Sequence, residues 1–178
     1  RYLAQVELQS VYRLGYVPHN YHFGWSTASL EGRGELAIRL AQDMAGMVDA
    51  QTMRMRPLTT LQHYWITPVY AYVRFGKWDR ILNLDEPAED LVYPRAVYHY
   101  ARGMAYTRQG NQQAARNELG RLDELRTDPS LRWVTVWGIN QSQHILEIAA
   151  HSLSGEIAAA EGDFEAAIDR LERAVERE

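Results

Sequence analysis

Apolar positions along this chain recur with the spacing of amphipathic helices, and glycines separate the segments that carry them. The clearest segment is the last one, FEAAIDRLERAVERE, in which the apolar side chains fall on one stripe of a helix: Phe164, Ala167, Ile168, Leu171, Ala174 and Val175. Helix-like stretches lie before and after each of four glycines, Gly32, Gly76, Gly110 and Gly162. Glycine suits the left-handed residue that ends a helix and begins a tight turn. The pattern therefore predicts an all-α chain of paired helices.

Small and apolar residues repeat at fixed distances from these glycines. Around Gly110 they are Gly103 and Tyr106 on the upstream side and Ala115 and Leu119 on the downstream side. The same offsets from Gly162 hold Gly155, Ala158, Ala167 and Leu171. Antiparallel helices approach closely only where neither carries a bulky side chain, so we expect Gly103 to lie against Ala115.

This pattern resembles the tetratricopeptide repeat (TPR), a helix–turn–helix unit of about 34 residues. The resemblance implies one domain over residues 1–178, folded as a right-handed superhelix (an α-solenoid) of about four units, at 18–50, 62–90, 96–128 and 148–178. The second unit departs from the pattern, because Asp85 stands at an apolar position and Pro87 is expected to cut its second helix short. Residues 128–147 form an enlarged linker, which we expect to make a longer or additional helix.

Longer phrases resemble a group of bacterial multi-repeat TPR proteins. They are PHNYHF with SLEGRGELAI, RFGKWDRIL and YPRAVYHYARGMAY. The resemblance implies a bacterial source and further repeats beyond this piece, and it implies no reaction. A solenoid needs a polar capping helix at each end, whereas the last helix here is amphipathic. We therefore expect further repeats, a partner or a second copy in a homodimer to cover that helix.

Composition narrows the classes of function. The net charge of −4, with acids and bases interleaved, disfavours a nucleic-acid partner, which needs a basic stripe. The chain has no cysteine, which excludes disulfides, thiolate metal sites and cysteine nucleophiles. It has no run of about 18 apolar residues, so we expect no membrane span. We expect a cytoplasmic protein, and a periplasmic location stays open.

The TPR resemblance also assigns candidate binding residues. In such arrays the first helix of each pair lines a concave groove. The groove positions lie thirteen, ten, six and three residues before the glycine of the turn, and a residue two before it comes to the groove's edge. Applied to this sequence, the register gives a set of expected contacts for a peptide or partner protein: His19, His22, His63, Tyr70, Tyr100, Met104 and Arg108.

Three of these candidates also suit a metal. His19 and His22 share a helix face just after Pro18, which fits the first helical position, and His63 lies on the next groove helix. Three neutral imidazoles with an open position are a reasonable ligand set for zinc or copper. The alternative function is therefore a small-ligand or metal-binding protein, or an enzyme, centred on His19, His22 and His63. Hydrogen bonding, capping and packing roles for the same residues stay open.

Catalytic motifs are missing from the sequence. It holds no phosphate loop, nucleophile elbow, dinucleotide fingerprint or HExxH metal motif. We therefore expect no cofactor and no enzymatic activity. The function that the sequence favours is recognition of a protein or peptide in the groove, as in a scaffold.

Overall fold

The computed structural model describes the backbone from residue 12 and the side chains from residue 14, both to residue 178. Within that range the chain is mostly helical and almost without strand. The α-helices are α1 (Val17–Leu30), α2 (Gly34–Ala45), α3 (Thr60–Arg74), α4 (Trp78–Leu82), α5 (Val92–Arg108), α6 (Gln112–Leu125), α7 (Ser142–Ala160) and α8 (Phe164–Glu176). Shorter elements are the π-helical turn η2 (Tyr12–Tyr16), the 3-10 turns η3 (Thr52–Arg54), η4 (Arg56–Leu58) and η5 (Pro129–Trp133), and the strands β1 (Thr135–Val136) and β2 (Asn140–Gln141).

Four turns of the same kind join the helices in pairs. Gly32, Gly76, Gly110 and Gly162 have φ values of 72°, 62°, 78° and 86°, which is the left-handed region that favours glycine. In each turn the residue after the glycine donates its backbone N–H to the carbonyl five residues earlier, over 2.9–3.0 Å. This bond satisfies a carbonyl at the end of the first helix. The prediction of a turn at each of these glycines is confirmed.

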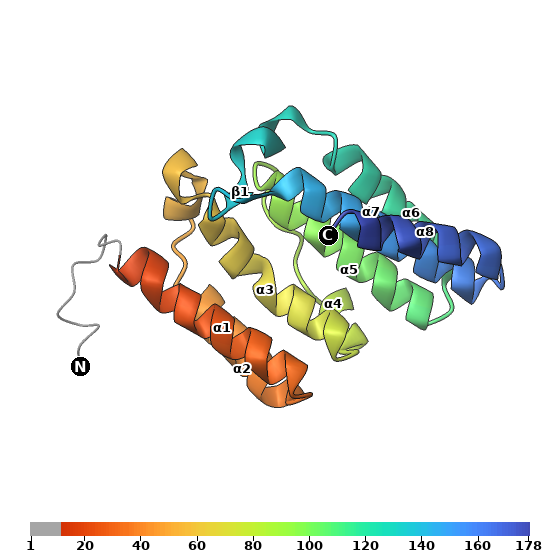
Figure 1. Ribbon diagram of the computed structural model, residues 1–178, viewed down its shortest axis with the longest axis horizontal. Coiled ribbons are helices and arrows are strands. Elements are labelled where there is room, and N and C mark those ends of the chain that lie inside the picture. Colours follow the sequence, from red (N-terminus) through yellow and green to blue (C-terminus); the bar gives the residue numbers. More distant parts are fainter. Residues whose placement is uncertain (1–11) are drawn as a thin grey trace.

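The pairs follow one another across the molecule, from α1 and α2 on one side to α7 and α8 on the other (Figure 1). The helices α1, α3, α5 and α7 contact each other in that order. One hydrophobic core runs through α2 to α7, and a smaller one, with Met44, Met53 and Leu61, lies where α2 and the following loop meet α3. The chain therefore places α1, α3, α5 and α7 in a continuous layer.

The second pair is incomplete, as the sequence predicts. Helix α4 covers Trp78–Leu82, and it ends five residues before Pro87 rather than at the proline. The side-chain amide of Asn83 donates to the carbonyl of Asp79 over 2.8 Å, which competes with continuation of the helix.

The expected close approach at Gly103 involves a different neighbour. A Cβ placed on Gly103 would lie 2.5 Å from Cδ2 of Leu153, so this glycine makes room for a side chain of α7.

The linker between α6 and α7 contains a β-hairpin, whereas the sequence predicts only helix there. Its residues form η5 and a small antiparallel hairpin, with Thr135 paired to Gln141 and Val136 to Asn140. A longer helix is also present, because α7 begins at Ser142 and precedes the expected start of the fourth unit by six residues.

The apolar stripe of the last helix is open to solvent in this chain. Phe164, Ile168 and Val175 are 67%, 58% and 69% exposed, whereas Ala167 and Ala174 are buried. Coverage of the stripe by further repeats or by a second copy stays a prediction. Within residues 12–178, no helix combines the length and the apolar character that crossing a membrane requires.

Candidate functional site

The candidate site begins with two histidines from neighbouring helices. His22 on α1 and His63 on α3 have ring centroids 5.4 Å apart. His63 Nδ1 lies 2.8 Å from the hydroxyl oxygen of Tyr93 on α5. His22 Nε2 is buried and has no hydrogen-bond partner among the described residues. One imidazole is therefore held by a hydrogen bond, and the other keeps a free polar nitrogen beside it.

Tyr93 connects this pair to further tyrosines. Its side chain is fully buried, and its hydroxyl lies 3.2 Å from the hydroxyl of Tyr70 on α3. Tyr100 follows on α5, where burial and, to a smaller extent, the carboxylate of Glu156 on α7 raise its pKa.

An ion pair ends the series. Arg108 Nη2 at the end of α5 donates to Oε2 of Glu156 on α7 over 2.7 Å. Arg108 is about half exposed, and Glu156 is less so. Every helix of the layer thus contributes to a set that we call the polar row: His22, His63, Tyr93, Tyr70, Tyr100, Glu156 and Arg108.

Burial keeps most of the polar row uncharged. It lowers the pKa of His63 to about 3, with a smaller contribution from the positive charge of His22. The pKa of His22 is lowered as well, first by burial and then by His19. Burial raises the pKa of Tyr70 well above the ordinary value and that of Tyr100 to about 12. At neutral pH the row therefore offers neutral imidazoles and phenols, with charge at the Arg108 end.

These values limit the chemistry of the row. A general base works best with a pKa near the operating pH. An imidazole with a pKa of about 3 is a weak proton acceptor, so His63 is poorly suited to proton transfer at neutral pH. Its hydrogen bond to Tyr93 suits it better to holding neighbouring polar groups in place.

The ring of His19, whose charge also lowers the pKa of His22, packs against other aromatic side chains. It lies against Phe23 with centroids 4.8 Å apart, and against Trp137 of the hairpin turn with centroids 5.5 Å apart. No group of three His, Cys, Asp or Glu side chains among the described residues is placed to hold a metal ion. The structure therefore does not gather His19, His22 and His63 into a ligand set.

Met104 also differs from its expected place. It is 7% exposed and belongs to the main hydrophobic core, so its side chain packs inside rather than lining a surface. His99, which the sequence leaves out of the candidate set, lies buried between α5 and α6, and its Nδ1 is 2.6 Å from Oε2 of Glu118. The remaining candidates, His22, His63, Tyr70, Tyr100 and Arg108, belong to the polar row.

The candidate residues chosen from the sequence do not include Tyr93 or Trp137. Tyr93 lies four residues before the first groove position of its unit, because α5 begins at Val92 rather than near residue 96. Trp137 lies in the linker, where the alternation of VTVWG before a polar stretch is a hairpin signal. A strand reading of that alternation would have found the turn.

Comparison of this chain with protein-family models, with curated proteins and with solved structures finds no match.

Proposed function

We propose that this chain is a TPR-like right-handed solenoid that recognises a segment of a partner protein. The segment binds along the layer of α1, α3, α5 and α7 and contacts the accessible members of the polar row, while the buried Tyr93 holds His63 in place. This proposal keeps the recognition function that the sequence favours, and it replaces His19 and Met104 with Tyr93 and Glu156 in the set of residues that support the site.

The repeated turn geometry supports the solenoid. Gly32, Gly76, Gly110 and Gly162 have the same backbone conformation and the same closing hydrogen bond. Helices that repeat one packing arrangement stack in a single direction, and the stack presents a continuous surface from the first helix of each pair.

The observation that carries the proposal is the polar row itself. Its contacts cross three helix boundaries: His22 meets His63 between α1 and α3, His63 meets Tyr93 between α3 and α5, and Arg108 meets Glu156 between α5 and α7. A small molecule occupies one site, whereas a peptide backbone presents donors and acceptors along its length. A row of neutral polar groups that spans the layer matches the peptide.

The charged end of the row gives the segment a direction. Arg108 is exposed enough to donate to a partner while it stays paired with Glu156. A guanidinium binds a carboxylate by two parallel hydrogen bonds. We therefore expect an acidic side chain or the terminal carboxylate of the segment at Arg108, and uncharged polar groups near His22.

Selection from a phage-displayed library of random peptides tests this function without a known partner. Peptides that bind the protein should lose about tenfold or more in affinity with Arg108→Ala, because a hydrogen bond to a charged group contributes about 1.5–3 kcal/mol. His22→Ala should weaken the same peptides.

Arg116→Ala is the matched control. Arg116 pairs with Glu161 through Nη2 and Oε1, 2.5 Å apart, and the exposure of both side chains resembles that of Arg108 and Glu156. It lies on α6, outside the layer, so its loss should leave peptide affinity unchanged. Selected peptides that bind Arg108→Ala and His22→Ala as tightly as the parent would contradict the proposal, as would a failure to select any peptide.

A further inference from the structure

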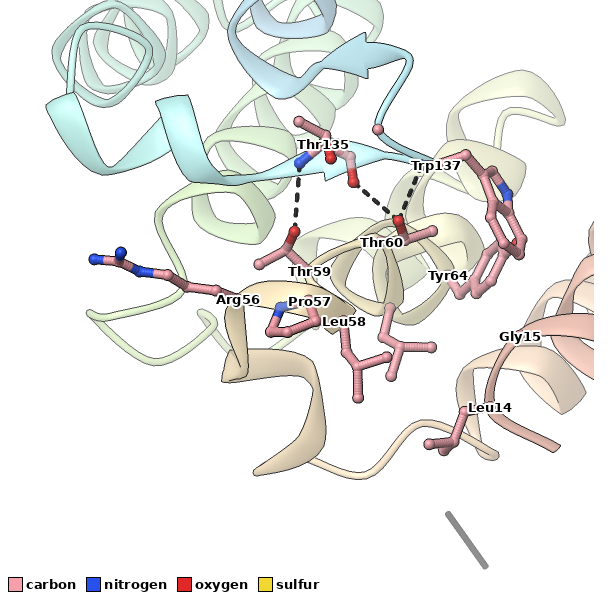
Figure 2. A pocket seen from close by; sticks show the side chains of 12 residues that line it. Leu14, Gly15, Arg56, Pro57, Leu58, Thr59, Thr60, Tyr64, Thr135 and Trp137 are labelled. Carbon is pink, nitrogen blue, oxygen red and sulfur yellow. Dashed lines mark hydrogen bonds between the residues drawn. The ribbon is translucent and has the colours of Figure 1, made fainter. Parts of the chain in front are cut away.

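The two longest connections of the chain meet at one corner of the molecule. One joins α2 to α3 and contains η3 and η4, and the other joins α6 to α7 and contains the hairpin. Thr60 Oγ1 donates to the carbonyl of Thr135 over 3.1 Å and accepts from the backbone N–H of Trp137 over 2.9 Å (Figure 2). Thr59 Oγ1 donates to the carbonyl of Trp133 over 3.1 Å. The start of α3 thus fixes a hairpin about 75 residues further along the chain.

The hairpin turn holds Trp137 in an unfavourable backbone conformation. Its φ is 57°, and among the described residues it is the one non-glycine with positive φ. Gly138 follows with φ 69°, and Ile139 N donates to Val136 O over 3.1 Å. Asn, Asp and Gly are the residues that favour this position of a turn. Non-glycine residues in such conformations concentrate at functional sites, so the tryptophan side chain needs an explanation.

The side chain of Trp137 forms a wall of a cavity. It stands beside Tyr64, with ring centroids 6.1 Å apart, and is 48% exposed (Figure 2). The cavity has a volume of about 530 Å³. Its apolar lining comes from segments far apart in sequence, namely Leu14, Pro57, Leu58, Leu61, Tyr64 and Trp137. Cavities of roughly 300–1,000 Å³ are typical of small-molecule sites.

The polar groups of the lining restrict the ligand. The hydroxyls of Thr59 and Thr60 already donate their hydrogens to carbonyls of the hairpin segment, so neither has a hydrogen left to donate to a ligand. No acidic side chain is found in the described lining, which leaves a cationic ligand without a counter-charge. Arg56 is the charged residue of that lining, but its guanidinium lies over the ring of Trp133, 4.4 Å from the centroid, and points away from Tyr64 and Trp137 (Figure 2), so an anionic ligand in the cavity has no counter-charge beside it either. The hydroxyl of Tyr64 is buried and interacts with the side chain of Trp137, so Tyr64 contributes its ring to the lining rather than a free polar group.

We propose that this cavity is a binding site for a neutral, mainly apolar small molecule. The body of the molecule packs against Leu14, Leu58 and Leu61, and the rings of Trp137 and Tyr64 cover one side. The site involves none of the residues of the polar row and does not rest on the recognition of a peptide.

Titration with N-phenyl-1-naphthylamine, a neutral apolar dye that fluoresces in dry surroundings, tests the site. We expect saturable binding of one dye per chain. Leu58→Trp fills the cavity and should weaken binding by about tenfold or more. Trp137→Gly removes the wall and relieves the positive-φ conformation, which offsets part of the packing that the ring loses against His19 and Tyr64, so this variant should fold and bind more weakly.

Phe164→Ala is the control for dye that binds to exposed apolar surface. Phe164 is 67% exposed on α8, far along the chain from the cavity, and its loss should leave the affinity unchanged. Circular dichroism confirms that each variant is folded. The proposal is overturned by the absence of dye binding to the parent, by equal affinity in the parent and Trp137→Gly, or by a loss of binding with Phe164→Ala.

Discussion

Replacement of Tyr93 by phenylalanine tests whether the polar row is held together by one buried hydroxyl. The Tyr93 hydroxyl lies 2.8 Å from His63 Nδ1 and 3.2 Å from the Tyr70 hydroxyl, and the side chain has no exposed surface. Phenylalanine keeps the ring and its packing. The variant therefore removes the two hydrogen bonds with little change in shape.

The expected cost follows from those contacts. A net hydrogen bond contributes about 0.5–1.5 kcal/mol, and a buried partner left without one costs about 1–3 kcal/mol. Removal of the tyrosine hydroxyl also removes its own desolvation cost, roughly 1–3 kcal/mol, which offsets part of the loss. We expect Tyr93→Phe to lower the free energy of unfolding by about 2 kcal/mol.

Urea unfolding at neutral pH, followed by circular dichroism, measures this difference. Tyr72→Phe is the matched control, because the Tyr72 hydroxyl accepts one hydrogen bond, 2.8 Å long, from Gln42, which is exposed and can bond to water instead. Its cost should be below about 1 kcal/mol. If Tyr93→Phe costs no more than Tyr72→Phe, the hydroxyl does not hold the row together.

Three further predictions concern pH, packing and the hairpin. The pKa of His63 is about 3 in the folded chain and about 6.5 when unfolded, so between these values the unfolded state binds one more proton than the folded state. The free energy of unfolding should therefore fall as pH drops from about 6.5 towards 3. Urea titrations across that range should show a flatter dependence for His63→Gln. Gly103→Ala places a Cβ 2.5 Å from Leu153 Cδ2, and the cost of overpacking, about 1–3 kcal/mol, should exceed the gain in helix propensity of about 1 kcal/mol. Gly120→Ala, with nothing within 4 Å of its Cβ, should raise the stability. Thermal unfolding that ranks the two variants in the opposite order would contradict this packing. Thr60→Val removes both hydrogen bonds to the hairpin and should accelerate amide exchange at Trp137 while amides in the middle of α5 exchange as in the parent; unchanged exchange at Trp137 would show that other contacts hold the hairpin.

Local sequence determined the helices and their turns. Each turn needs a residue with positive φ, which glycine adopts without strain. The apolar spacing around the glycine specifies amphipathic helices on both sides. These properties depend on residues a few positions apart, so the sequence suffices to place Gly32, Gly76, Gly110 and Gly162. The register also predicts that His22, His63, Tyr70 and Tyr100 belong together, because equivalent positions of stacked units lie side by side.

Tertiary structure decided everything that depends on contacts between distant segments. The hairpin takes its place because Thr60 bonds to it across about 75 residues, and it brings Trp137 against His19. Gly103 faces Leu153 of α7 rather than the helix after its own turn. Periodicity cannot specify such pairings, because it is a property of one helix, whereas the meeting of two connections depends on the packing of all the helices between them.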